Sequence, residues 1–155
     1  MPENTANRVT KQIIDFLVSI GIRVVSAEVL TGAFLPGIRV DRGTLIVDES
    51  RLDWPGDLLH EAAHLAMAPV SRREGMGENA GDDGGEELGA IAWSWAAAIH
   101  LGLDPEIVFH AGGYRGGSAS ILENFRDRRY IGVPYLRWIG LTSEDYPAMI
   151  RWLRD

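Results

Sequence analysis

The sequence predicts an α+β fold in which a small β-sheet comes first and a core of helices follows. Three observations support this prediction: helical periodicity over residues 4–19, short β-branched runs over residues 22–48, and apolar helical stretches separated by glycine-rich segments after them. The chain has 155 residues, which is enough for one compact core, and neither a repeat nor a linker divides it. We therefore expect a single domain over residues 1–155.

The N-terminal third of this domain predicts one helix and a few short strands. Apolar residues recur along one side of a helix over residues 4–19, and Gly21 ends it. Residues 22–30 are rich in β-branched side chains and are typical of an extended segment. Residues 37–48 predict two strands joined by a turn at residues 41–43.

Two apolar helices are expected to form the centre of the domain. The first begins near Pro55, a favoured first-turn residue, and stops before Pro69. The second covers residues 86–100 and ends at Gly102. Between them, residues 71–85 are acidic and rich in glycine, which predicts a loop.

The last third of the chain predicts shorter helices and a packed aromatic core. A short helix is expected to begin at residues 104–105, one from Ser118 or Ser120 to residue 125, and a C-terminal one over residues 143–153. Residues 109–117 are glycine-rich and predict a flexible segment. Four tryptophans are expected in the core: Trp93, Trp95, Trp138 and Trp152.

The composition excludes several classes of site and partner. The chain contains no cysteine, so any metal must be held by nitrogen and oxygen ligands. A formal net charge of −7 argues against general binding to nucleic acid or membranes, because both attract basic faces. The N-terminus has no signal-like organisation, and the apolar run over residues 91–103 is too short to span a bilayer. We expect a cytoplasmic protein that binds neither nucleic acid nor membranes.

The first central helix carries the motif HEAAH, in which His60 and His64 lie four residues apart and Glu61 follows the first histidine. Residues four apart project from the same face of a helix, so both imidazoles can reach one metal ion. In HExxH metal hydrolases, two neutral histidines hold zinc and the glutamate takes a proton from the metal-bound water. The pattern predicts His60 and His64 as metal ligands and Glu61 as a catalytic base.

A third protein ligand is needed, because a catalytic zinc usually takes three and leaves one position for water. The extended motif HExxHxxGxxH would place it at residue 70, where this chain has valine. His100 lies at the far end of the second central helix, roughly 20 Å from Glu87 at 1.5 Å per residue, so the two cannot share one metal, and we favour a glutamate over His100. Glu86 and Glu87 begin that helix, and the residues alone do not separate them.

The order of a strand at residues 44–50, the HEAAH helix, a glycine-rich loop and the helix EELGAIAWSWAA resembles the ImmA/IrrE-like family of immunity-repressor proteases and radiation-response regulators, within the zincins. The resemblance covers residues 37–101. It implies Glu87 as the third ligand, because in that family the glutamate precedes an alanine and an aromatic residue, here Ala90 and Trp93. The chain has no recognisable helix-turn-helix, and residues 109–141 resemble short uncharacterised bacterial proteins.

The segment FHAGGYRGG offers two further candidates, His110 and Tyr114. Both side chains can donate hydrogen bonds to an oxyanion during hydrolysis, which makes them candidate catalytic residues. The alternative is that they anchor a loop and take no part in chemistry.

Two hypotheses about function follow. The first is a zinc-dependent hydrolase, a peptidase acting on a peptide or protein substrate, in which His60, His64 and Glu87 hold Zn²⁺. The resemblance adds a regulator that cleaves a repressor as a form of this hypothesis. The second is a non-catalytic regulatory or binding protein whose metal site is structural or empty. Neither predicts an oligomeric state.

Overall fold

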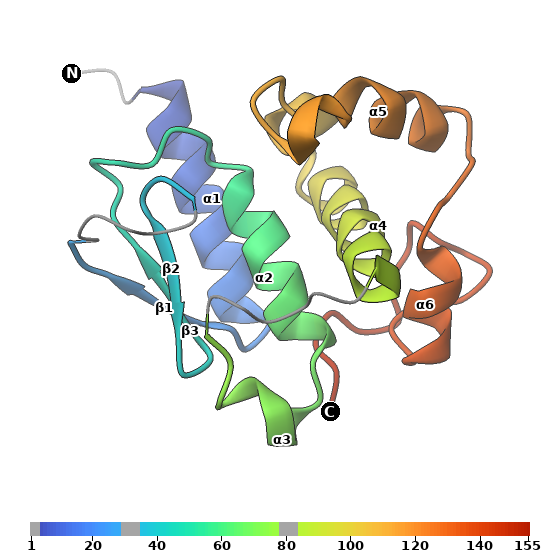
Figure 1. The fold of residues 1–155 in the computed structure, drawn as a ribbon, viewed down its shortest axis with the longest axis horizontal. Coiled ribbons are helices and arrows are strands. Elements are labelled where there is room, and N and C mark those ends of the chain that lie inside the picture. Colours follow the sequence, from blue (N-terminus) through green and yellow to red (C-terminus); the bar gives the residue numbers. More distant parts are fainter. Residues whose placement is uncertain (1–3, 29–34, 78–83) are drawn as a thin grey trace.

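A computed structural model describes residues 4–28, 35–77 and 84–155, and it has the predicted α+β architecture (Figure 1). In these ranges the chain forms six α-helices and one three-stranded sheet. None of the helices in this part of the chain has both the length and the apolar content that crossing a membrane requires.

The first helix and the sheet form where the sequence predicts them. Helix α1, Thr5–Ser19, begins after Asn4, whose side-chain oxygen accepts a hydrogen bond from the Ala6 N–H at 3.1 Å. Strands β1, Arg23–Ser26, β2, Ile38–Asp41, and β3, Thr44–Val47, follow. Strand β3 lies in the middle, parallel to β1 and antiparallel to β2, so the hairpin predicted over residues 37–48 is confirmed.

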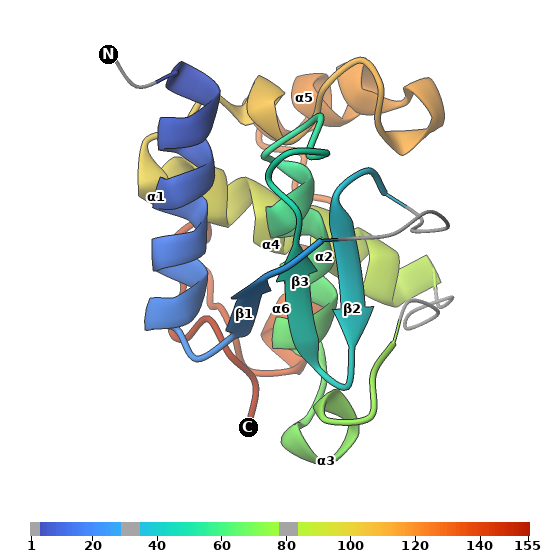
Figure 2. The same cartoon turned by 90° about the vertical axis from the view of Figure 1, so that its left-hand side faces the viewer.

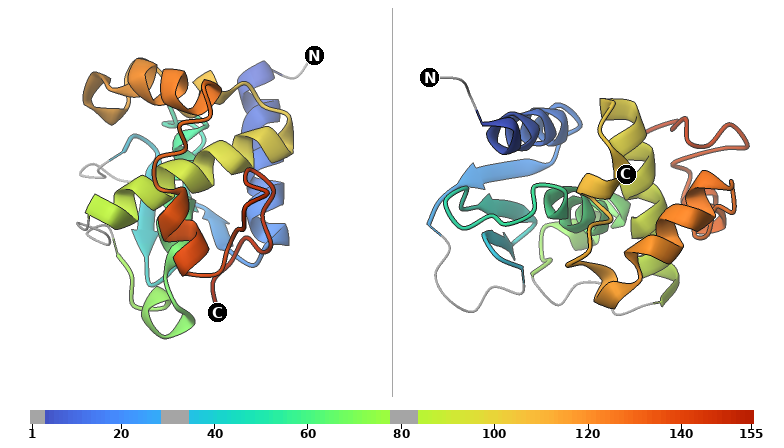
Figure 3. Two further views of the ribbon diagram at one scale, coloured as in Figure 1. Left: turned by 90° about the vertical axis from the view of Figure 1, so that its right-hand side faces the viewer. Right: turned by 90° about the horizontal axis from the view of Figure 1, so that it is seen from above.

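The molecule is built in layers beside the sheet. One face of the sheet carries the buried side chains of β2 and β3, namely Ile38, Val40, Leu45 and Val47. Figure 2 shows α2, Asp57–Met67, behind this sheet with α1 beside it, and the right panel of Figure 3 shows α4, Gly84–Leu101, on the far side of α2. Helix α6, Val133–Trp138, packs on the outer side of α4.

Helix α2 is the centre of the molecule because it is apolar on almost every side. All of its residues are buried except His60 and Glu61, which are half-buried. Its packing against α4 needs a small residue, and Gly89 provides it. A Cβ atom at Gly89 would lie 3.2 Å from the Met67 sulfur and 2.6 Å from a ring carbon of Tyr135. Gly89 therefore lets α2, α4 and α6 approach one another.

The C-terminal end of α2 has its carbonyl groups paired by two arginines. The Arg73 guanidinium donates to the carbonyls of Leu65 and Ala68, at 2.8 Å each, and to the carbonyl of Arg154. The backbone N–H of Arg154 donates to the Ala66 carbonyl at 2.8 Å. These bonds satisfy carbonyls that have no partner within the helix, and they fix the C-terminus of the chain against α2.

Three predicted segments are confirmed only in part. The loop predicted over residues 71–85 begins with a short helix, α3, Val70–Arg73. Residues 78–83 of this predicted loop lie outside the described residues. Helix α5, Ser118–Arg126, begins at Ser118, and the Ser118 hydroxyl donates to the His110 carbonyl and does not cap the helix. The short helix at residues 104–105 is a 3-10 turn, Pro105–Ile107, capped by Asp104 as expected.

The prediction of a C-terminal helix over residues 143–153 is wrong. This segment is folded by contacts with the rest of the molecule: Thr142 pairs with Met149 in a β-bridge, the Tyr146 hydroxyl donates to the Ala92 carbonyl at 2.6 Å, and the Trp152 carbonyl accepts from the Trp93 indole at 3.0 Å. These bonds replace the local bonds of a helix.

Helix α6 was not predicted, because its six residues are too few for a clear helical period. Its last residue, Trp138, is 77% exposed, so the expectation that this tryptophan is in the core is wrong. Trp93 and Trp95 are buried as expected, and Trp152 is partly buried against the core.

Candidate metal site

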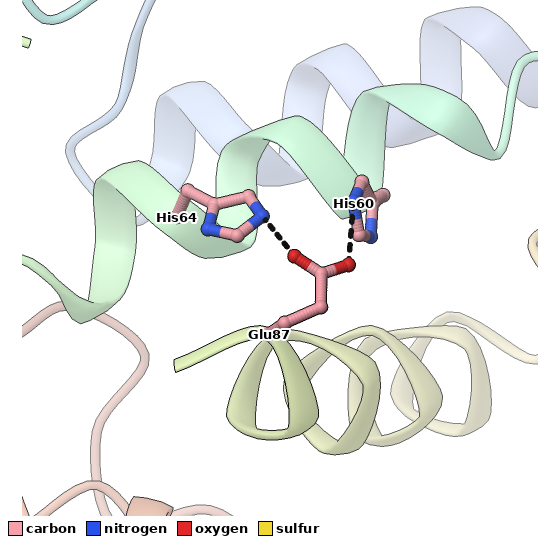
Figure 4. A group of neighbouring side chains, drawn as sticks. All are labelled: His60, His64 and Glu87. Carbon is pink, nitrogen blue, oxygen red and sulfur yellow. Dashed lines mark ion pairs between the residues drawn. The ribbon is translucent and has the colours of Figure 1, made fainter. Parts of the chain in front are cut away.

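Three side chains predicted as metal ligands meet between α2 and α4. His60 and His64 project from α2, and Glu87 reaches up between them from the first turn of α4 (Figure 4). The His60 Nε2 atom lies 3.3 Å from one Glu87 oxygen, and the His64 Nε2 atom lies 3.1 Å from the other. Each residue offers a ligand atom within 4.8 Å of the other two, so the group can hold a metal ion.

The spacing of these atoms fits a small tetrahedral cation. With metal–ligand bonds of about 2.1 Å, two ligands of a tetrahedral zinc lie about 3.4 Å apart. The nitrogen–oxygen separations of 3.3 and 3.1 Å are close to this edge length. The two separations involve different oxygens of Glu87, and one ligand atom from each of the three residues lies within 4.8 Å of the others. Nitrogen and oxygen donors of this kind suit zinc among other divalent transition metals.

Glu86 and Glu87, which the residues alone did not separate as candidates for the third ligand, have different positions in the structure. Glu86 is buried, and one of its oxygens accepts a hydrogen bond from the Arg72 guanidinium at 2.7 Å. Glu87 is next along the helix, about 100° further round, and faces the two histidines. His100, rejected as a ligand, lies near the opposite end of α4, where its ring packs against Phe16 and Trp152.

The two histidines have opposite shifts in pKa although they share one carboxylate. Burial lowers the pKa of His60 to about 4 and outweighs the attraction of Glu87. Burial also acts to lower the pKa of His64, but the hydrogen bond and negative charge of Glu87 outweigh it and raise that pKa. The hydrogen bond from His64 lowers the pKa of Glu87. His60 is therefore the more readily neutral imidazole, as metal ligation requires.

Glu61 lies beside this group. It follows His60 in α2 and is half-buried, and its negative charge contributes to the raised pKa values of His64 and Tyr114. Its carboxylate is therefore close enough to act electrostatically on the site, whereas Glu87 contacts both imidazoles directly.

The two candidates from residues 109–117 have different positions. The Tyr114 hydroxyl lies 3.0 Å from the Nδ1 atom of His60, on the opposite side of the ring from Glu87. The His110 Nε2 atom lies 2.8 Å from Asp57, and its ring stacks on Trp54 with centroids 4.0 Å apart. Tyr114 thus touches a predicted ligand, and His110 is held by a different carboxylate.

Two residues of the site's surroundings were not predicted, Asp57 and Arg72. Asp57 is in the first turn of α2, and burial raises its pKa while the contact with His110 acts to lower it. Its partner is 53 residues away, so no local spacing indicates the pair. Arg72 holds Glu86 across a gap of 14 residues, which likewise leaves no sequence pattern.

Comparisons of the chain with protein-family models, with curated proteins and with solved structures find no match. The resemblance to the ImmA/IrrE-like family therefore stays a prediction from the residues.

Proposed function

We propose that this protein is a zinc-dependent hydrolase with a zincin-like core, in which His60, His64 and Glu87 hold the metal. The observation that supports the proposal most strongly is that all three side chains converge from two separate helices. Helix α4 begins at the site, so its first-turn carboxylate lies opposite the two imidazoles of α2. A group of this composition uses three protein ligands, as catalytic zinc sites do.

The chemistry of the proposal is divided between the metal and Glu61. A zinc ion held by His60, His64 and Glu87 would lower the pKa of a bound water toward about 7 and so supply the nucleophile. Glu61 accepts the proton of the attacking water and returns it to the leaving group. This role is supported by the position of Glu61, which follows His60, is half-buried, and acts electrostatically on His64 and Tyr114. The resemblance to the ImmA/IrrE-like family favours a peptide or protein substrate, with water attacking the amide carbonyl.

A second candidate function is a regulatory or binding protein without catalysis. One observation favours it: Glu87 already pairs with both imidazoles, so the polar groups that face it satisfy one another without a metal. Such a site can stabilise the contact between α2 and α4 and do nothing else. Metal binding and turnover separate the two candidates.

The test uses the purified full chain and two variants, Glu61→Gln and Glu123→Gln. Glu123→Gln is the control, because it makes the same substitution at an exposed residue of α5. We expect wild type and both variants to bind one zinc per chain, and only Glu61→Gln to lose hydrolysis of peptide or unfolded-protein substrates, by about a hundredfold or more. If zinc-loaded wild type cleaves no substrate that Glu61→Gln leaves intact, the hydrolase proposal fails and the non-catalytic candidate stands.

A further inference from the structure

The segment over residues 109–117 is fastened to α2 at two points one helical turn apart. His110 lies 2.8 Å from Asp57, and Tyr114 lies 3.0 Å from His60. Asp57 and His60 are three residues apart, so both point from the same side of α2. His110 is buried, and its stacking on Trp54 fixes the start of the segment. The contacts of His110 with Asp57 and Trp54, together with the contact of Tyr114 with His60, thus hold Tyr114 beside α2.

The backbone at this point adopts a conformation that most residues avoid. Tyr114 has a φ of 53° and Arg115 a φ of 52°, so two neighbouring residues with side chains lie in the left-handed region. This costs about 1–2 kcal/mol per residue, and it persists only where surrounding contacts hold it. The Tyr114 ring supplies such contacts: it meets the His60 ring edge-on at 5.2 Å and the Phe109 ring at 5.3 Å.

A hydroxyl group at Nδ1 suits an imidazole that must present its other nitrogen to a metal. When Nε2 ligates a cation, Nδ1 carries the ring proton and needs an acceptor. When Nε2 instead donates to Glu87, Nδ1 has a lone pair and needs a donor. A tyrosine hydroxyl can accept in the first state and donate in the second, whereas a carboxylate can only accept.

We propose that Tyr114 is a positioning residue: its hydroxyl holds the His60 ring with Nε2 directed toward Glu87 and so increases the affinity of the site for a divalent metal. This inference rests on the proposed metal site and assigns Tyr114 a place behind the ligand, in place of the oxyanion role expected from sequence. It acts through His60 alone. Among the described residues, the Nδ1 atom of His64 is buried and has no hydrogen-bond partner.

The test compares Tyr114→Phe with Tyr146→Phe in the full chain. The control also removes one tyrosine hydroxyl with a single acceptor, the Ala92 backbone carbonyl, which lies five residues after Glu87 in α4 and is not bonded to a predicted ligand. Zinc affinity is measured by competition with a chromogenic chelator, and the fold is checked by circular dichroism. We expect Tyr114→Phe to bind zinc about 10–100-fold more weakly and Tyr146→Phe to stay within about threefold of wild type.

A second measurement does not depend on a variant that folds. In ¹⁵N-labelled wild type, the histidine nitrogen spectrum of the zinc-loaded protein should show His60 protonated at Nδ1, with a proton protected from exchange by the bond to Tyr114. A rapidly exchanging Nδ1 proton, or equal zinc affinity of Tyr114→Phe and wild type, overturns the inference while the proposed function stands. If wild type binds no zinc, both the proposed function and the role of Tyr114 in metal affinity are contradicted.

Discussion

Helix α2 carries two sets of polar groups that are paired in different ways. At its C-terminal end, the backbone carbonyls of Leu65, Ala66 and Ala68 accept hydrogen bonds from Arg73 or from the backbone of Arg154. The second set consists of the side chains Asp57, His60 and His64, from the first turn of the helix to the last. These pair with other side chains: His60 and His64 with Glu87, His60 also with Tyr114, and Asp57 with His110.

This difference indicates which set carries function. Backbone carbonyls at a helix end need partners in every protein, so the arginines there explain stability and nothing further. Two histidines and a half-buried glutamate between two helices are not needed by the fold, because apolar residues of similar size would fill the same space with less loss of hydration. Their pairing can also be exchanged for a cation, which the pairing of the carbonyls cannot. We therefore expect substitutions in the two sets to separate stability from metal binding.

The largest effect is expected from Arg73→Ala, which leaves three backbone carbonyls without their donor. We expect the free energy of unfolding to fall by about 3 kcal/mol, measured by urea denaturation, with zinc affinity unchanged in the folded protein. Arg151→Ala is the control, since Arg151 makes an exposed ion pair with Asp155, and a change within about 0.5 kcal/mol is expected. A large loss of zinc affinity in Arg73→Ala would remove the distinction between the paired carbonyls and the paired side chains of α2.

The next largest effect is expected on zinc affinity, when either of two neighbouring glutamates of α4 is replaced. Glu87→Gln should weaken zinc binding by about a hundredfold, equivalent to about 2.7 kcal/mol, because it replaces a charged ligand with a neutral amide. Glu86→Gln keeps a partner for Arg72 and should leave zinc affinity within about threefold of wild type. Calorimetric titration of both variants decides the matter, and equal losses would mean that α4 presents both carboxylates to the ion.

A smaller effect concerns pH in the metal-free protein. The lowered pKa of Glu87 means that its stabilising contact is lost as pH falls from its ordinary value of 4.5 through the folded value. The raised pKa of His64 means that the contact is fully present below 6.5 and is lost as pH rises through the folded value. His60, with a pKa of about 4, is mostly neutral between these limits.

The difference in unfolding free energy between wild type and Glu87→Gln should therefore be largest between pH 4.5 and 6.5. Because 40% of the Glu87 side chain is exposed, we expect a maximum of only about 1 kcal/mol. Chemical denaturation in the presence of a chelator measures it. A difference that rises steadily with pH would show that the His64–Glu87 pair does not form without metal.

The smallest effect is expected for a residue that belongs to neither set of polar groups. Trp138→Ala changes an exposed residue of α6, and we expect the unfolding free energy to change by less than about 0.5 kcal/mol and zinc affinity not at all. A loss of several kcal/mol, as for a buried tryptophan, would mean that this surface is covered in solution.

The parts of the fold that the sequence predicts correctly have a local signal. Apolar periodicity indicates α1, α2 and α4, and the turn at residues 41–43 indicates the hairpin, because in each case the pattern extends over the whole element. The segment after Thr142 misled the prediction because its conformation depends on distant groups, namely the carbonyl of Ala92 and the indole of Trp93. No pattern within that segment contains this information.

For the candidate site, too, the sequence predicts what depends on local spacing and not what depends on distant contacts. The spacing of His60 and His64 predicts that they share one face, since four residues make about one turn. Choosing between Glu86 and Glu87 requires the rotation of α4 relative to α2, which is fixed by packing at Gly89 and by the bond between Arg72 and Glu86. The contacts of His110 and Tyr114 with α2 join positions more than 50 residues apart, so no sequence pattern could predict them.

X-ray absorption at the zinc edge, on wild-type protein loaded with one equivalent of zinc, tests most directly whether His60, His64 and Glu87 hold the metal. We expect two imidazole nitrogens and carboxylate or water oxygens at about 2.0–2.2 Å, and loss of the imidazole signal in the doubly substituted variant His60→Ala/His64→Ala. A protein that takes up no zinc, or a wild-type spectrum without imidazole scattering, would show that these residues do not form a zinc site.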